Sequence, residues 1–243
     1  MTLQLAELDG AIFDMDGVIT RTAETHAAAW KQLFDEFLVT ASPQSPPFDI
    51  DQDYRLYVDG KPRYDGVASF LSSRGITLPW GQPNNAPGLE TVCGLGNMKD
   101  KYFQQLVERD GVRVFDSTIL LLQRLREANL KTGVFTASRN AAEILSAAQV
   151  TGLFDDKIDG LDAERLGLPG KPSPAVLLEL TRRLGLEPPR TAVFEDAIAG
   201  VQAGRAGGFG MVVGINRGSH RGALRSNGAT VEVRDIAELT VSI

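Results

Sequence analysis

The sequence has a single cysteine, Cys93, in 243 residues, so no disulfide can form within the chain. No apolar run approaches the roughly 20 residues that a membrane-spanning helix needs, and the N-terminus lacks the basic and apolar segments of a secretory signal. Acidic side chains outnumber basic ones and give a net charge of -6, which argues against nucleic acid or anionic membrane as the main partner. We therefore expect a cytoplasmic protein with neither kind of partner.

Two nucleotide-binding motifs are also missing. Neither a Gly-x-Gly-x-x-Gly sequence nor a Walker lysine follows the first apolar run, which ends at Asp14. A non-enzymatic nucleotide-binding module therefore has no motif of its own here. The fold class alone does not exclude such a module, and it stays open as an alternative.

A pair of carboxylates stands out instead. The apolar run Ala11–Phe13 ends in Asp14 and Asp16, and Gly17 then permits a tight turn. An EF-hand loop starting at Asp14 would need an oxygen ligand at Val18, and it would also need glycine and glutamate further on, where the chain has Ile19 and Thr25. Two aspartates at the carboxyl end of a parallel strand favour a Mg²⁺ site for phosphoryl chemistry, with a solvated turn as the alternative.

Strand and helix patterns alternate in the second half of the chain. This alternation predicts an α/β fold, a doubly wound parallel sheet in a Rossmann-like core domain of residues 1–22 and 111–243. Residues 23–110, which include a loop-rich stretch, interrupt this series and would form an insertion after the first strand. The expected later strands are Thr132–Phe135, Thr191–Phe194, Met211–Ile215 and Thr230–Val233, and the expected helices are Thr22–Phe37, Val67–Leu71, Gly96–Asp110, Thr118–Ala128, Ala141–Ala148, Pro174–Leu184 and Ile198–Ala206.

Polar residues follow two of these predicted strands, and a lysine precedes the predicted helix Pro174–Leu184. Thr136 and Ser138 bring hydroxyls and backbone N–H groups to a helix N-terminus, where a phosphoryl group is favoured, although a plain N-cap is the alternative. Lys171 could supply the fixed cation that a transferring phosphoryl group needs, or be a surface lysine. Glu195 and Asp196 form a second acidic strand end.

The predicted insertion carries its own candidates. Thr22, His26 and Trp30 recur at helical spacing and lie on nearly one face of the first helix. Arg63, in a glycine-rich turn, could grip a phosphate, although a surface arginine is an equal alternative. Lys99 lies near the start of its expected helix, where a cation opposes the helix dipole unless a ligand holds it there.

Together these motifs resemble the haloacid dehalogenase-like superfamily, and more narrowly the β-phosphoglucomutase-like subgroup. Four family motifs match Asp14-Met15-Asp16-Gly17-Val18, Thr136 with Ser138, Lys171, and Glu195-Asp196. The subgroup's further motifs match Thr22, His26, Trp30, Ala137-Ser138-Arg139-Asn140 and Gly170-Lys171-Pro172; Gly60 and Arg63 match cap residues that meet the substrate's distal phosphate, and Lys99 matches a cap lysine loosely.

The resemblance implies that residues 23–110 form an inserted α-helical cap domain, and it also implies a mechanism. Asp14 would attack phosphorus and become an aspartyl phosphate, and Asp16 would act as general acid and base. Thr136, Ser138 and Lys171 would form the rest of the catalytic set, with Ser138 and Lys171 holding the phosphoryl oxygens. Mg²⁺ would sit on Asp14, the backbone carbonyl of Asp16 and Asp196, with Glu195 as a ligand through water or as an orienting group. The remaining matched residues would bind substrate: Thr22, His26, Trp30, Gly60, Arg63, Lys99, Ala137, Arg139 and Asn140.

Substrate identity is less constrained than the chemistry. Arg21 stands where the subgroup usually has an aspartate, and the segment from the forties to the eighties is longer and richer in loops than in familiar mutases. We expect a sugar phosphate mutase that converts β-glucose 1-phosphate to glucose 6-phosphate, acting on a hexose phosphate as a monomer. Hydrolysis of small sugar phosphate monoesters by a phosphatase of the same superfamily is the main alternative.

Overall fold

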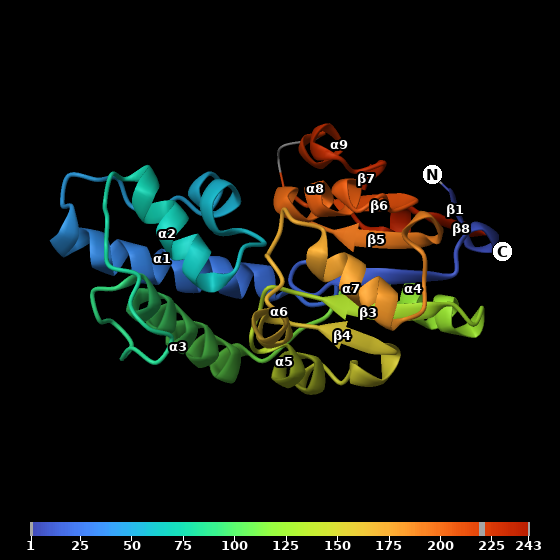
Figure 1. Cartoon of the computed structure of the whole chain (residues 1–243), viewed down its shortest axis with the longest axis horizontal. Coiled ribbons are helices and arrows are strands. Elements are labelled where there is room, and N and C mark those ends of the chain that lie inside the picture. The colour runs from blue at the N-terminus through green and yellow to red at the C-terminus, as the bar shows by residue number, and fades with distance from the viewer. Residues whose placement is uncertain (1, 219–221, 243) are drawn as a thin grey trace. The chain divides into compact units, whose positions relative to one another are not determined.

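The computed structural model describes residues 2–218 and 222–242, and the chain divides into two compact units (Figure 1). The first, here called the core unit, comprises Met1–Arg21 and Arg113–Ile243, and the second, called the inserted unit, comprises Thr22–Val112. Among the described residues, we find no helix with both the length and the apolar character that crossing a membrane requires.

The core unit is built on a parallel sheet, which confirms the predicted α/β class. Among the described residues six strands pair in the order β4-β3-β2-β5-β6-β7. The order reverses between β2 and β5, and open α/β sheets bind ligands at such a switch point. The strands are β2 (Gly10–Asp14), β3 (Lys131–Phe135), β4 (Asp156–Ile158), β5 (Thr191–Glu195), β6 (Met211–Ile215) and β7 (Val231–Val233).

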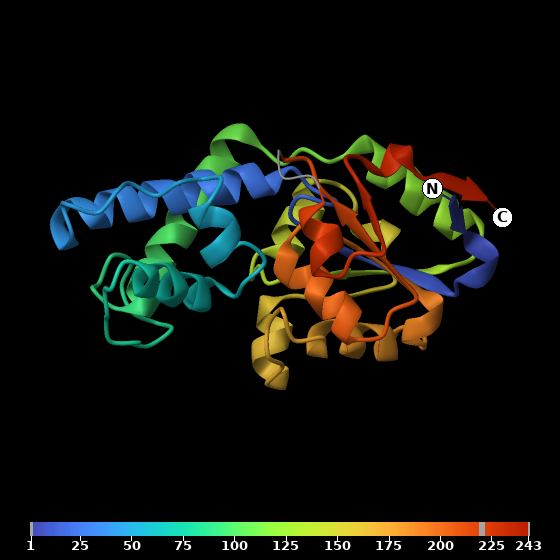
Figure 2. The same ribbon diagram turned by 90° about the horizontal axis from the view of Figure 1, so that it is seen from above.

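Apolar residues on both faces explain why β2 and β5 lie at the centre of the sheet. Ile12 and Val193 share a buried cluster with α7 (Ala175–Arg183) and α8 (Ile198–Ala206). The next residue of each strand points to the opposite face, where the rings of Phe13 and Phe194 stack with centroids 4.4 Å apart. Helix α4 (Asp116–Glu127) lies on the other side of the sheet from α7 and α8 (Figure 2).

Several core elements were not predicted. Strand β4 and α6 (Gly160–Leu166) are short and rich in charge, so neither shows a clear hydrophobic period. Strand β1 (Thr2–Gln4) pairs in parallel with β8 (Thr240–Ser242), which brings the two ends of the chain side by side.

The remaining core elements are α5 (Ala141–Ala147), α9 (Ala223–Asn227) and the 3₁₀ turns Leu5–Glu7, Thr151–Leu153, Pro188–Arg190 and Ile236–Glu238.

The inserted unit consists of three helices and a π-helical turn around an aromatic centre. Phe34, from α1, packs against Phe48 and Phe70 with ring centroids 5.2 and 4.0 Å away. Helix α1 is longer than predicted because apolar residues continue at helical spacing as far as Leu38. The elements are α1 (Thr22–Ala41), the π-helical turn Tyr54–Val58, α2 (Arg63–Ser73) and α3 (Val92–Asp110).

The prediction for the start of α3 was wrong. The helix begins at Val92 because the Thr91 side chain accepts a hydrogen bond from the Gly94 N–H, 2.9 Å away, and caps the first turn. Gly96 lies inside the helix, where a Cβ would come within 2.7 Å of the Tyr64 ring, so this glycine allows close packing. Lys99 is therefore well inside α3 rather than near its start, and its side chain is buried.

Candidate active site

Asp14 lies at the carboxyl end of β2, between the ends of two neighbouring strands. The register pairs Asp14 with Phe135 of β3, and Phe13 with Phe194 of β5, so Glu195 follows at the same level of the sheet. Asp14 is 5% exposed and Glu195 is fully buried. Two buried carboxylates on adjacent strands repel each other unless a cation compensates them.

Lys171 supplies that positive charge. Its Nζ lies 2.5 Å from Asp14 Oδ1 and 3.0 Å from Glu195 Oε2, and it stands 4.9 Å from the centre of the Phe135 ring. The other Glu195 oxygen accepts a hydrogen bond from the Ala197 N–H at 3.1 Å. Glu195 is thus held at both oxygens, and Lys171 bridges the two strands.

Burial and mutual charge shift the pKa values of these three groups. Burial raises the pKa of Asp14 well above its ordinary value, the charge of Glu195 raises it further, and Lys171 opposes the shift. Burial likewise raises the pKa of Glu195 against the opposing effect of Lys171. Burial alone would lower the pKa of Lys171, but the two carboxylates outweigh that effect and raise it, so Lys171 stays charged.

Three carboxylates at the carboxyl ends of β2 and β5 could share a metal ion. Asp14, Glu195 and Asp196 each offer an oxygen, and these atoms all lie within 4.8 Å of one another. A set of oxygen donors with buried negative charge fits a hard divalent cation such as Mg²⁺. Gly17 leaves room for this arrangement, since its φ is +83° and a Cβ would lie 1.7 Å from Asp196 Oδ2.

Asp16 has a different environment from Asp14. Its Oδ2 accepts a hydrogen bond from Thr136 Oγ1 at 3.2 Å, and the same hydroxyl accepts from the Ser138 N–H at 3.0 Å. The Ser138 hydroxyl in turn accepts from the Asn140 N–H at 3.2 Å. The loop after β3 therefore orients the Asp16 carboxylate, and Asp16 lies outside the group of three carboxylates that could share a metal.

The other two predicted residues of this loop contact α6. Arg139 Nη1 lies 2.7 Å from Glu164 Oε2 in an ion pair. The Ala137 carbonyl lies so close to Gly160 that a Cβ there would approach to 2.6 Å. These contacts fix the loop, and the roles of Ala137 and Arg139 toward a substrate stay predictions.

In the inserted unit the structure brings three of the predicted residues together. Lys99 Nζ hydrogen-bonds His26 Nδ1 and lies 5.1 Å from the centre of the Trp30 ring system and 4.9 Å from that of Phe103. The imidazole also stacks on Phe103 at a centroid distance of 4.0 Å. Thr22, also predicted, is buried in the first turn of α1.

Arg63 begins α2 and forms an ion pair that the sequence did not reveal. Its Nη2 lies 2.6 Å from Asp100 Oδ1, and the two side chains are 14% and 21% exposed. Gly60, in the turn before α2, has a φ of +68°, a conformation that favours glycine. Asp100 was missed because 37 residues separate it from Arg63 and no local pattern marks the pair.

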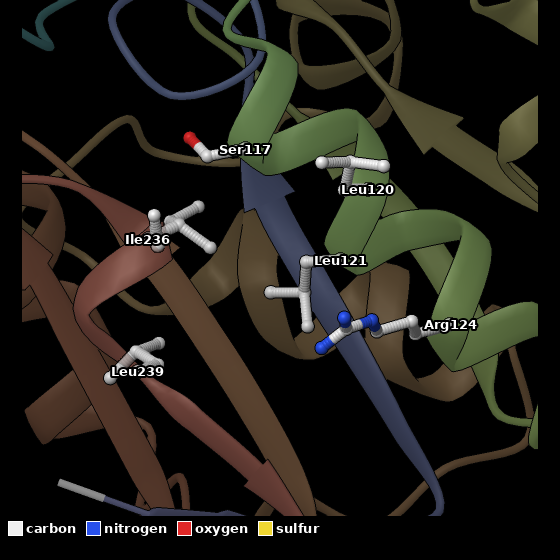
Figure 3. A pocket seen from close by; sticks show the side chains of 7 residues that line it. Ser117, Leu120, Leu121, Arg124, Ile236 and Leu239 are labelled. Carbon is white, nitrogen blue, oxygen red and sulfur yellow. The ribbon is translucent and has the colours of Figure 1, made fainter.

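A separate pocket of about 290 Å³ opens on the core unit between α4 and the turn Ile236–Glu238 (Figure 3). None of its lining residues belongs to the predicted site, and the lining contains no carboxylate: Ser117, Leu120, Leu121, Arg124, Ile236, Ala237 and Leu239. We therefore place the chemistry at the ends of β2 and β5 instead.

The comparisons with known proteins agree with this fold. Residues 8–208 match the family described as haloacid dehalogenase-like hydrolase. A β-phosphoglucomutase from Mycobacterium bovis is 43% identical over 94% of this chain and 90% of its own length. A phosphorylated carbohydrates phosphatase from Thermotoga maritima is 25% identical over 93% of this chain and 94% of its own length.

Solved structures show the same fold. The crystal structure of a β-phosphoglucomutase from Clostridium difficile aligns with a TM-score of 0.72 at 24% identity, covering 94% of this chain and 92% of that one. The family predicted from the four motifs is thereby confirmed, together with the enzyme class. The chain belongs to the haloacid dehalogenase-like hydrolase family, and it is a phosphotransferase or phosphatase of that family.

Proposed function

We propose that the chain is a Mg²⁺-dependent sugar phosphate mutase that converts β-glucose 1-phosphate to glucose 6-phosphate through a phosphorylated Asp14. The observation that carries the proposal is the buried Lys171, which joins the carboxylates of Asp14 and Glu195 at the switch point of the sheet. Support for the mutase comes from the 43% identity to a β-phosphoglucomutase over nearly the whole chain.

The core residues divide the chemistry between them. Asp14 attacks phosphorus, so that one difficult transfer becomes two easier ones. Lys171 and the Ser138 hydroxyl hold the phosphoryl oxygens. The positive charge of Lys171 and the hydroxyl dipole of Ser138 stabilise the negative charge of the transition state. Asp16 passes a proton to and from the sugar oxygen, and its hydrogen bond from Thr136 fixes the carboxylate for that transfer.

The acidic cluster would hold Mg²⁺. Asp14, Asp196 and the backbone carbonyl of Asp16 are the proposed ligands. Bound Mg²⁺ would offset the repulsion between the Asp14 carboxylate and the phosphoryl group. Glu195, whose two oxygens bind Lys171 and Ala197, would orient Lys171 or act through water rather than bind the metal directly.

Residues of the inserted unit and of the loop after β3 would recognise the sugar phosphate. Arg63 and Gly60 would bind the distal phosphate, since a guanidinium binds phosphate through two hydrogen bonds. Lys99 and His26, which already contact each other, would be further substrate contacts. The other proposed contacts are Thr22, Trp30, Ala137, Arg139 and Asn140.

A phosphatase activity is the second candidate function, and the similarity to the Thermotoga maritima phosphatase supports it. The two activities differ in what attacks the phosphorylated Asp14: a sugar hydroxyl in the mutase and water in the phosphatase. A bound sugar at high effective concentration outcompetes water when the site excludes solvent.

One assay separates the two activities. The enzyme is given Mg²⁺, β-glucose 1-phosphate and a trace of glucose 1,6-bisphosphate, and phosphorus NMR follows the products. Formation of glucose 6-phosphate supports the mutase, whereas release of inorganic phosphate supports the phosphatase.

A substitution tests the covalent route. Asp14→Asn removes the nucleophile and should abolish turnover while leaving the fold intact. Asp9→Asn is the matched control, because Asp9 immediately precedes β2 at its other end and forms an exposed ion pair with Arg190. Turnover that survives in Asp14→Asn would refute the phosphorylated aspartate.

A further inference from the structure

Arg217 makes a long-range contact that none of the roles above uses. It follows β6 by two residues, and its Nη1 donates a hydrogen bond to the backbone carbonyl of Gly17, 200 residues away in sequence. Gly17 belongs to the turn that carries Asp14 and Asp16. A side chain from the far half of the core unit therefore holds the turn on which the proposed chemistry depends.

An aromatic ring fixes the direction of this guanidinium. Arg217 Cζ lies 3.5 Å from the centre of the Phe115 ring, and Arg21 Cζ lies 4.7 Å from the same centre. Phe115 is itself buried. A planar guanidinium that stacks on a ring keeps its in-plane N–H groups free to donate, which an ammonium group cannot do in the same way.

Gly17 in turn contacts Asp196, one of the proposed metal ligands. The two residues are so close that a Cβ on Gly17 would overlap Asp196 Oδ2 at 1.7 Å, so any shift of this turn changes the space left for that carboxylate. Partial burial lowers the pKa of Arg217, and the charges of Asp196 and Asp235 oppose that effect. Arg217 is therefore linked to the Asp196 carboxylate through the Gly17 turn.

We propose that Arg217 is a positioning residue: it clamps the Gly17 turn against Asp196 and so presets the carboxylate geometry that binds a divalent cation. Arg217 would touch neither substrate nor metal. The inference rests on the proposed Mg²⁺ site and adds a residue that the family motifs in this sequence do not include.

The test measures Mg²⁺ binding directly, by titration calorimetry on the full chain without substrate. Partners that orient metal ligands typically contribute about 10- to 100-fold to metal affinity, so Arg217→Ala should raise the Kd for Mg²⁺ by at least about 10-fold. Arg217→Lys keeps a cation near Asp196 but loses the planar stack, and it should give an intermediate Kd. At saturating Mg²⁺ the substrate KM of both variants should match that of the unaltered enzyme.

Arg190→Ala is the matched control, because it removes the same charge from an exposed ion pair with Asp9. Circular dichroism checks folding, and if Arg217→Ala does not fold, Arg217→Lys decides the question. Unchanged Mg²⁺ affinity in the folded Arg217 variants, or an equal loss in Arg190→Ala, would overturn the inference and leave the proposed function standing. A substrate KM that rises at saturating Mg²⁺ would also overturn it, by making Arg217 a substrate contact. No Mg²⁺ binding by the unaltered enzyme would overturn both proposals.

Discussion

Replacing Lys171 by methionine should destabilise the core unit strongly. The substitution keeps an unbranched chain of similar length but removes the charge that lies 2.5 Å from Asp14 and 3.0 Å from Glu195. All three side chains are at most 7% exposed, so the two carboxylates would stay buried and uncompensated. Breaking a buried pair in this way costs about 3–5 kcal/mol. At about 2–4 °C per kcal/mol for a chain of this size, the melting temperature should fall by roughly 6–20 °C.

The loss of stability in Lys171→Met should depend on pH, and the pKa shifts of Asp14 and Glu195 determine its direction. Burial already raises the pKa of Asp14 and of Glu195, and in the variant Lys171 no longer opposes that shift. A carboxyl group whose pKa is higher in the folded than in the unfolded state favours folding below its unfolded pKa, and this contribution is lost as the pH rises through the folded value. The stability deficit of Lys171→Met should therefore be larger near about pH 8 than near about pH 5.

Scanning calorimetry without divalent cations measures this effect. Both tryptophans, Trp30 and Trp80, lie in the inserted unit, so their fluorescence follows that unit separately. Lys131→Met is the control, because Lys131 is 53% exposed in its ion pair with Asp155 and should contribute under about 1 kcal/mol. A deficit in Lys171→Met no larger than that of the control, or one that does not change with pH, would refute the reasoning.

Three further substitutions test separate parts of the structure. Gly200→Ala would place a Cβ 2.0 Å from Glu195 Cδ, so it should cost about 1–3 kcal/mol by calorimetry and reduce turnover; unchanged stability would contradict the packing. Phe70→Ala should destabilise the inserted unit by about 3–5 kcal/mol, seen by tryptophan fluorescence, unless the aromatic centre collapses to fill the space. Arg63→Ala, which also removes the partner of Asp100, should raise KM for a sugar phosphate far more than KM for p-nitrophenyl phosphate; equal effects would exclude a distal phosphate contact.

The sequence predicted those parts of the fold that have a strong local signal. Strands β2 and β5 are continuous apolar runs that end in acids, and both their buried position and their parallel pairing follow from that pattern. Strand β4, with two charged residues out of three, has no such pattern and is defined by its pairing with β3. Local sequence therefore located the central strands and the edge strand β7, whereas tertiary contacts determined the edge strand β4.

In the candidate site, too, local sequence predicted the residue types, whereas their contacts depended on the fold. The residue types at Asp14 and Lys171 were predicted from motifs, but their separation of 157 residues meant that only the fold could show that they touch. Arg217 was overlooked although it follows a predicted strand, where the rule applied to Thr136 would have marked it. The Lys99 contact with His26 was not predicted because 73 residues separate the two in sequence.

The charge balance of the site also predicts an order of binding. Asp14, Asp16, Glu195 and Asp196 are acids that lie near the ends of β2 and β5, and the positive charge of Lys171 is shared between two of them. The excess negative charge should repel a phosphate ester, so the ester should bind only after a divalent cation. Calorimetric titration with a non-reacting phosphonate analogue should therefore show no binding in EDTA and clear binding once Mg²⁺ is added. Equal affinity in both conditions would mean that cations of the protein itself neutralise the site and that the metal acts only later, in the transfer step.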